Sequence, residues 1–208
     1  MLKRKLYRWE TALLLTLAAV LLWGMWSVSG QQALSDKVVR LHILANCDTA
    51  SDQTLKLQVR DAVLEEAEQL LQSCRDREEA QRVLDRALPE IQTLAENEIA
   101  ARGYDYAVTA ELTDTAFPTR EYGDFTLPAG KYLALRIVIG AGEGHNWWCV
   151  VFPPLCAESV TDVAETAMSA GFSEDDVKLM TEEENGYVLK FKSIELWQNL
   201  KTYLSRKR

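Results

Sequence analysis

The residues best suited to catalysis in this chain are His145 and Cys149, which lie four positions apart. An imidazole can lower the pKa of a neighbouring thiol and accept its proton, so the pair is compatible with a cysteine hydrolase. If residues 147–152 are extended, four residues span roughly 13 Å, and the side chains meet only if the loop folds back. His42, in another predicted strand, is the alternative base. We favour the opposing interpretation, a polar loop histidine beside a structural cysteine.

Two other patterns point to chemistry that the rest of the sequence does not support. Asp48-Thr49-Ala50 and Asp114-Thr115-Ala116 are similar to the Asp-Thr-Gly turns of aspartic proteases, but each has Ala where the turn needs Gly. The glycine-rich segment 140–144 leads into another strand, whereas a nucleotide-binding loop leads into a helix. With two histidines, no HExxH and no CxxC, the chain lacks a metal-ligand pattern. We therefore predict no catalytic residues, no metal and no cofactor.

The N-terminus has the pattern of an export signal. Basic residues precede an apolar run from Thr11 to Val28 that contains no charge. A helix of this length measures roughly 27 Å, near the lower limit for spanning a bilayer, so a cleavable signal and an uncleaved anchor both remain open. Trp23 and Trp26 favour the anchor, whereas the small residues that follow offer cleavage sites. We assign residues 1–30 to a signal peptide or membrane anchor and residues 37–208 to a single extracytoplasmic signalling domain.

The net charge restricts the partners of that domain. The chain has 23 basic and 31 acidic residues and a formal charge of −8. Four of the basic residues and one acidic residue lie in the first thirty positions, which leaves 19 basic against 30 acidic side chains, a charge of −11, on the remainder. Nucleic acids and anionic lipid headgroups would repel such a body. We expect no nucleic-acid partner, and membrane contact only through an uncleaved N-terminal segment.

Export would place the four cysteines where disulfides can form. Cys149 and Cys156 flank a short strand and a double-proline turn that could bring the second thiol back toward the first. A disulfide between them would stabilise the fold by roughly 2 to 3 kcal/mol. Two reduced, buried cysteines are the alternative, and the sequence leaves both open. We do not pair Cys47 and Cys74.

The elements that position these residues follow from hydrophobic periodicity. Residues 37–45 alternate polar and apolar side chains, which predicts a strand with Arg40 and His42 on one face and Leu41 and Ile43 on the other. Helices and further strands are expected in the rest of the chain. The predicted helices are 52–73, 77–101 with a kink at Pro89, 160–170 and 193–205, and the predicted strands are 104–112, 131–139, 147–152 and 187–191. A turn is expected at Thr113-Asp114, and a loop or hairpin at 117–130.

Strands grouped between helices indicate an α+β fold. We expect a small, mostly antiparallel sheet with helices packed on one face, preceded by the N-terminal signal or anchor helix.

Aromatic residues gather in the predicted loops, notably Phe117, Tyr122 and the pair Trp147 and Trp148. Successive strand residues face opposite sides, so if Trp147 packs inward, Trp148 points outward unless another element covers it. Exposed Trp, Tyr and Arg anchor many protein interfaces. An interface role and burial of both tryptophans remain open.

Five segments of the chain together resemble the stage II sporulation protein R family of endospore-forming bacteria. They are residues 39–46, 55–61, 117–123, 127–130 and 146–156, of which the last, NWWCVVFPPLC, is the most specific. The resemblance covers about residues 1–157, and Cys47 departs from it because the family more often has Ser there.

The resemblance implies an intercellular signalling role in sporulation. The chain would be exported from the forespore into the intermembrane space, where it would activate a membrane-embedded aspartic protease of the mother cell that processes pro-sigma-E. On this interpretation the chain is an activator and not an enzyme, and an exported cell-wall cysteine hydrolase is the alternative. The residues that we expect to contact the protease are Arg120, Tyr122, Asn146, Trp147 and Trp148.

Overall fold

The computed structural model describes residues 7, 9–17, 34–122, 125–155 and 162–181. Residues 9–17 are helical, whereas residues 1–6, 8 and 18–30 of the predicted leader, the strand at 187–191 and the helix at 193–205 lie outside the described residues. Within the described ranges, no helix combines the length and the hydropathy needed to cross a membrane.

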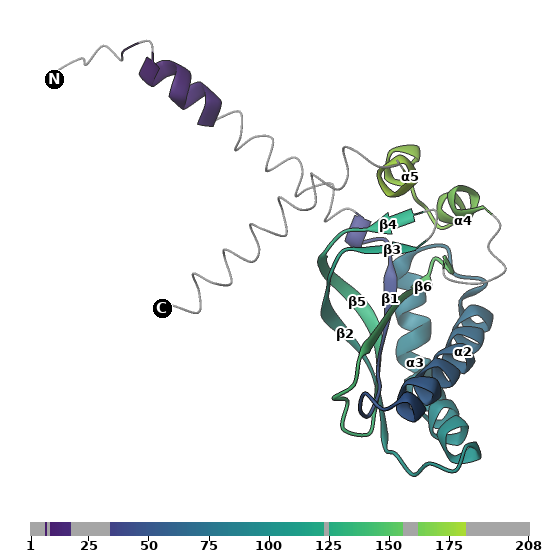
Figure 1. Cartoon of the computed structure of the whole chain (residues 1–208). Helices are drawn as coiled ribbons and strands as arrows, with labels where there is room; N and C mark the ends of the chain where they lie inside the picture. The colour runs from purple at the N-terminus through teal and green to yellow at the C-terminus, as the bar shows by residue number, and fades with distance from the viewer. Residues whose placement is uncertain (1–6, 8, 18–33, 123–124, 156–161, 182–208) are drawn as a thin grey trace.

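A four-stranded sheet forms the centre of the domain (Figure 1). Its strands are β1 (Val39–Leu44), β2 (Val108–Phe117), β5 (Gly130–Ile139) and β6 (Asn146–Phe152), in the spatial order β2-β5-β1-β6. β1 and β5 run parallel, and the other two pairs are antiparallel. The prediction of a mostly antiparallel sheet is therefore confirmed.

Two long helices, α2 (Ala50–Leu71) and α3 (Arg77–Ala101), cover one face of the sheet (Figure 1). Each begins at a side-chain cap: Thr49 for α2 and Asp76 for α3 accept a hydrogen bond from the backbone N–H three residues later. α3 continues through Pro89 with the bounds that the sequence predicted.

The main hydrophobic core lies between these helices and the sheet. Alternate residues of the two central strands meet the apolar stripes of the helices, as the periodicity predicted. The core includes Leu41, Ile43, Leu135 and Ile137 from the sheet, and Leu55, Val59, Val63, Leu84, Ile91 and Ile99 from the helices. The predicted α+β class is confirmed, and the two long helices pack on one face.

A second, smaller core lies on the other face of the sheet, at one end. It is built by the hairpin of β3 (Arg120–Tyr122) and β4 (Phe125–Leu127) together with α4 (Val163–Ser169) and α5 (Glu174–Thr181). Its buried residues include Leu34, Val38, Phe117, Phe125, Leu127, Tyr132, Val150, Phe172 and Met180. The hairpin and α4 fall where the sequence predicted a hairpin and a helix, whereas α5 and this second core were not predicted.

The prediction for β2 is wrong at both ends. The sequence indicated a strand at 104–112 followed by a turn at Thr113-Asp114, but β2 starts at Val108 and continues to Phe117. Ten consecutive residues of β2 pair with β5 in an unbroken register. This cross-strand pairing outweighs the turn preference of Asp and Thr.

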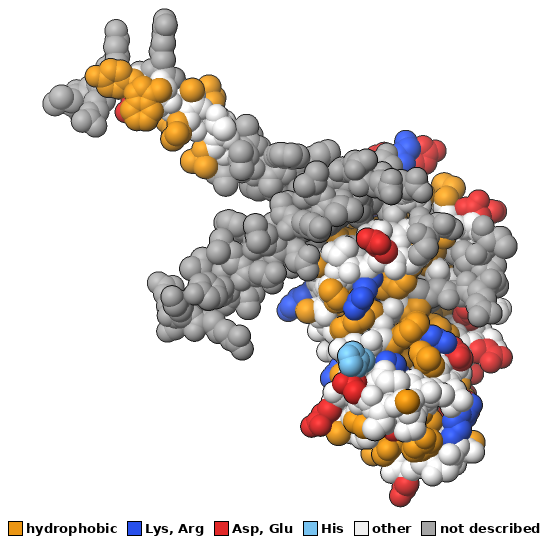
Figure 2. All heavy atoms as spheres, viewed as in Figure 1, with side chains coloured by type: hydrophobic (Ala, Val, Ile, Leu, Met, Phe, Trp, Pro, Cys, Tyr) orange, Lys and Arg blue, Asp and Glu red, His pale blue; other side chains and the backbone are white. Residues whose placement is uncertain are grey.

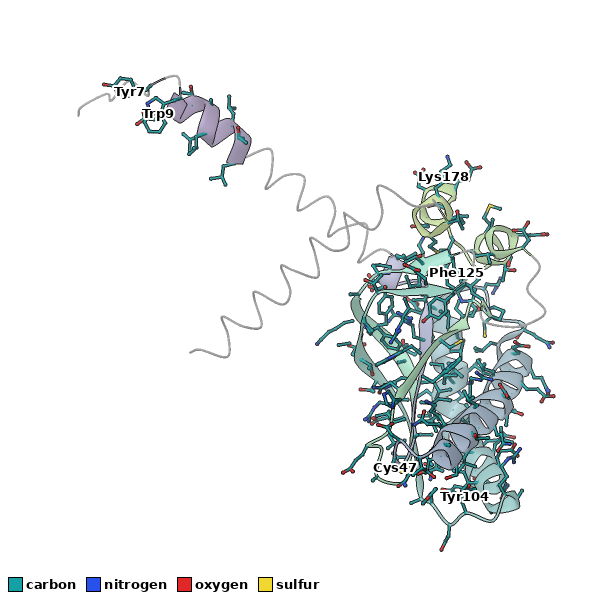
Figure 3. The ribbon with its side chains drawn as sticks, in the orientation of Figure 1. Tyr7, Trp9, Cys47, Tyr104, Phe125 and Lys178 are labelled. Carbon is teal, nitrogen blue, oxygen red and sulfur yellow. The ribbon has the colours of Figure 1, made fainter. Side chains whose placement is uncertain are left out.

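At the end of the domain opposite Phe125, a buried carboxylate organises the turn between β1 and α2 (Figure 3). Asp52, 3% exposed, accepts hydrogen bonds from the Cys47 backbone N–H at 3.1 Å, the Asn46 amide at 2.8 Å and the Tyr106 hydroxyl at 3.3 Å. The Cys47 thiol and the Asn46 amide, with smaller contributions from the other donors, hold the pKa of Asp52 below its usual range. Asn46 in turn accepts from the backbone N–H of Ala141, which joins this turn to the β5–β6 loop.

Lys56 makes a second link to the same loop. Its ammonium group is buried and donates to the Gln53 side chain at 2.6 Å and to the His145 carbonyl at 2.8 Å. Burial lowers the pKa of Lys56. The glycine-rich 140–144 segment is therefore held as a turn between two strands, as the sequence predicted.

Asp52→Asn tests this network. The variant should lower the free energy of unfolding by about 1–3 kcal/mol at neutral pH, because an amide nitrogen then faces hydrogen-bond donors. The pKa of Asp52 is lower in the folded state, so its contribution is present above the unfolded pKa and is lost as pH falls through the folded pKa. Urea unfolding at neutral and acid pH should therefore find a weaker acid dependence in the variant than in the natural protein.

The control is Asp85→Asn, which changes an exposed carboxylate on α3. Equal effects of the two substitutions on stability would contradict the role given to Asp52.

Candidate functional site

Arg40 is a charged side chain with 0% exposure. Strand alternation directs it to the face of β1 opposite α2 and α3, as the sequence predicted. Three rings enclose it: the centroids of Phe117, Tyr132 and Tyr122 lie 4.1, 4.9 and 5.6 Å from the guanidinium carbon. We call these four residues the Arg40 cluster. They come from four strands, β1, β2, β3 and β5.

The hydrogen bonds of Arg40 are incomplete. Nε donates to the Cys149 carbonyl at 3.4 Å, and Nη2 donates to the Tyr122 hydroxyl, which itself donates to the Trp148 carbonyl at 3.3 Å. Nη1 has no hydrogen-bond partner among the described residues, and none of the ion pairs between them includes Arg40. A cation–π contact of a desolvated cation contributes about 2 kcal/mol or more, but removing an ion from water costs several, and no anion faces Arg40 among the described residues. The buried charge is therefore only partly compensated.

The protonation states in the cluster follow from burial. Burial lowers the pKa of Arg40 from its usual range; Tyr122 and Tyr132 oppose this shift, whereas Arg120 adds to it. An arginine still keeps its charge at neutral pH. Burial also raises the pKa of both tyrosines, although the charge of Arg40 partly opposes the shift. The cluster therefore consists of one cation among neutral rings.

His42 extends the site along β1. Its ring is stacked on Trp148 with 3.9 Å between centroids and an interplanar angle of 12°, and Nε2 lies 2.6 Å from the Asn146 side-chain oxygen. Burial lowers the pKa of His42, so the imidazole is neutral at neutral pH, and the contact with Asn146 places the proton on Nε2. Nδ1 has no hydrogen-bond partner among the described residues.

Four of the five predicted contact residues lie on or beside this face. Tyr122 belongs to the Arg40 cluster, and the Trp148 ring is 4.6 Å from that of Phe117. Asn146 joins through His42. Arg120 is exposed and starts β3, two residues before Tyr122, close enough to lower the pKa of Arg40. Whether these residues contact a partner stays a prediction.

The fifth residue, Trp147, lies on the opposite face. It packs at the edge of the main core, and its ring centroid is 4.4 Å from the guanidinium carbon of Arg60 on α2. Both tryptophans are partly buried. Strand alternation therefore separates Trp147 from the other predicted contact residues.

The sequence did not identify Arg40, Phe117 or Tyr132 as members of a site. One signal was available: Arg40 and His42 occupy alternate positions of an otherwise apolar strand, which places two nitrogen-bearing side chains on one face. The rings that enclose Arg40 are distant in sequence, so only the strand pairing brings them to it.

The residues considered for catalysis are not assembled into a Cys–His pair. Cys149 is buried and disulfide-bonded, which removes the thiolate that a hydrolase would use. His145 is exposed and pairs with Asp48. Asp114 lies within β2 and not in a turn, so the second Asp-Thr-Ala motif is no protease-like turn.

The disulfide prediction is tested in part. Cys149 is disulfide-bonded, whereas Cys47 and Cys74 are free thiols. Cys156 lies outside the described residues, so its pairing with Cys149 stays a prediction.

The part of the chain that the structure describes contains no group of three or more His, Cys, Asp or Glu side chains arranged to hold a metal ion.

The fold and the site define an α+β domain with an arginine enclosed by aromatic rings on the sheet face away from the two long helices. The family model described as Stage II sporulation protein R (spore_II_R) matches residues 35–162. The match spans β1 to β6 and therefore includes the whole Arg40 cluster. The chain belongs to this family.

A curated relative, Stage II sporulation protein R of Bacillus subtilis (strain 168), is 42% identical over 123 residues. The aligned segment covers 59% of this chain, and this chain spans about half, 55%, of the relative's length. No solved structure matches the chain. Family membership supports a role in sporulation.

Tyr122→Phe tests the hydrogen bond that closes the Arg40 cluster. Removing the hydroxyl should lower the free energy of unfolding by about 1.5–3 kcal/mol, because a buried charged donor loses its acceptor. Tyr104→Phe is the matched control at the other end of the domain and should change stability by less than about 0.5 kcal/mol. Urea titration measures both, and a neutral Tyr122→Phe would contradict the predicted contribution.

Serine substitutions test the disulfide. Cys149→Ser and Cys156→Ser should each lower the free energy of unfolding by roughly 2 to 3 kcal/mol, and the double variant should lose no more than either single one. Cys47→Ser should leave stability nearly unchanged, since a hydroxyl can replace the thiol as donor to Asp52. If Cys156→Ser is as stable as the natural protein in non-reducing buffer, Cys156 is excluded as the disulfide partner of Cys149.

Proposed function

We propose that this protein is an intercellular signal of sporulation that activates a membrane-embedded aspartic protease. It is exported from the forespore into the intermembrane space, cleaved from its leader or anchored by residues 11–28, and the activated mother-cell protease processes pro-sigma-E. The observation that carries this proposal is the family match over residues 35–162, which spans the sheet, both long helices and the candidate site.

The sequence outside the matched segment is consistent with export. Basic residues followed by an uncharged apolar run are typical of a signal or anchor segment. The formal charge of −8 favours a protein partner over nucleic acid or an anionic lipid surface. On the face shown in Figure 2, acidic and basic side chains are interspersed among apolar ones, so no single-sign patch dominates that view.

Activation by a protein partner requires differential binding. The domain must bind the active arrangement of the protease more tightly than the inactive one, because equal affinity for both would shift no equilibrium. We assign this contact to Arg120, Tyr122, Asn146 and Trp148, which lie on or beside the sheet face that α2 and α3 leave uncovered. Trp147 is left out because it packs against Arg60 of α2.

A cell-wall cysteine hydrolase is the weaker candidate. It would need a free thiolate at Cys149, but that sulfur is buried and disulfide-bonded. It would also need a histidine in contact with the thiol, whereas His145 pairs with Asp48 and His42 contacts Asn146.

The test is reconstitution in a non-sporulating host. The full chain, the aspartic protease and pro-sigma-E are co-expressed, and the processed sigma factor is quantified by immunoblot. Processing should require the chain. Trp148→Ala should reduce it at least about ten-fold, which corresponds to a loss of about 1.4 kcal/mol in binding free energy.

Trp147→Ala is the matched control, because it removes the same ring from the opposite face. It should retain processing when its folded fraction is matched to that of Trp148→Ala. Processing without the chain would overturn the proposed function. Full processing with a folded Trp148→Ala variant would overturn the assigned contact surface.

A further inference from the structure

The incomplete pairing of Arg40 needs a physical reason. Buried polar groups are almost always hydrogen-bonded, and a buried charge is normally paired with an opposite charge. Arg40 is 0% exposed, yet Nη1 has no partner and no carboxylate pairs with the guanidinium among the described residues. Replacing a buried ion with a hydrophobic side chain of similar volume often leaves the stability of the protein unchanged or raises it. The arrangement points to an anion that the described residues do not supply.

A second cation lies beside the first. Arg120 is exposed on β3, two residues before Tyr122, so strand alternation directs both side chains to the same face of the hairpin. The charge of Arg120 lowers the pKa of both Arg40 and Tyr122. None of the ion pairs between described residues includes Arg120. Two unpaired arginines therefore share one corner of a protein whose formal charge is −8.

We propose that this corner binds a carboxylate of the partner protease, an Asp or Glu side chain of an exposed segment, which pairs with Arg120 and completes the hydrogen bonds of Arg40. The inference rests on the function proposed above. Guanidinium groups bind carboxylates through two parallel hydrogen bonds, and such charge-assisted bonds are roughly twice as strong as neutral ones.

The Tyr122 side chain is the group that must move. Its hydroxyl accepts a hydrogen bond from Nη2 of Arg40 and donates one to the Trp148 carbonyl. A neutral phenol is a weaker acceptor for a guanidinium than a carboxylate, so the exchange gains energy at Arg40. The aromatic rings around the site exclude water, which strengthens the new ion pair further.

The chemistry of the rest of the surface favours specificity over affinity. The excess negative charge of the domain disfavours an acidic segment over much of its surface, whereas Arg40 and Arg120 together favour one at this corner. A carboxylate would therefore fix the register of the complex at the Arg40 cluster, whereas the neighbouring Trp148 ring would contribute apolar contact area.

The binding step is tested without the protease. The full chain is labelled with ¹⁵N-arginine in detergent micelles and titrated with the peptide acetyl-Gly-Glu-Gly-amide in the millimolar range. The Nε signals of Arg40 and Arg120, assigned from Arg40→Met and Arg120→Gln spectra, should move with the glutamate peptide and stay in place with acetyl-Gly-Gln-Gly-amide. Equal responses to both peptides, or none to either, would overturn the carboxylate site.

The functional step uses the reconstituted host. Arg40→Met should keep or raise the urea midpoint, since the unpaired charge is removed, and yet reduce processing at least about ten-fold. Arg120→Glu, an exposed change that does not threaten the fold, should reduce processing equally even if Arg40→Met fails to fold. Arg86→Glu makes the same charge change on the exposed surface of α3 and should retain processing. Equal processing by Arg120→Glu and Arg86→Glu would reject the inference.

The two proposals fail separately. If the natural chain triggers no processing, the proposed function falls, and the peptide titration still decides whether the corner binds a carboxylate. If the natural chain, Arg40→Met and Arg120→Glu all trigger processing, the carboxylate site falls and the proposed function stands.

Discussion

A positive charge inside the domain constrains the whole sheet face on which it lies. Arg40 points away from α2 and α3, so neither long helix can supply its counter-charge, and the strands enclose it. β2, β3 and β5 each contribute a ring, and β6 contributes a backbone carbonyl. The β3–β4 hairpin, which pairs with no strand of the main sheet among the described elements, is tied to that sheet partly through the Tyr122 hydroxyl. The second core and the candidate site therefore share residues, since Phe117 and Tyr132 enclose Arg40 and also belong to that core.

The sequence predicted those parts of the fold that depend on local periodicity. The α3 helix has the predicted bounds because its apolar stripe and its Asp76 cap are local signals. β1 was predicted to within two residues because its polar and apolar side chains alternate, and β5 and β6 to within one residue because each is a short apolar run bounded by turn residues. β2 was truncated because Thr and Asp in its second half resemble a turn, and only the pairing with β5, which is distant in sequence, makes them extended. The α5 helix was missed because the acidic residues of its first turn are equally typical of a solvent-exposed loop.

The candidate site was half predicted for the same reason. Aromatic and basic residues in the hairpin and β6 stood out by type, so Tyr122 and Trp148 were identified. Arg40 was placed on the correct face, but its isolation from any carboxylate is a property of three-dimensional packing that spacing does not reveal. Strand alternation in β6 also places Trp147 against the main core and Trp148 against the second core, on opposite faces of the sheet. Interface residues on adjacent strand positions can thus belong to different surfaces.

The entry of the chain into the sheet orients the domain. Leu34 and Val38 pack in the second core beside Phe117 and Phe125, and Lys37 forms a 2.6 Å ion pair with Asp176 of α5. The polypeptide that follows the leader therefore joins the domain at the same end as the Arg40 cluster, away from the Asp52 network. Under the proposed function, a leader retained in a bilayer would tether the domain at this end, whereas cleavage of the leader would remove the tether.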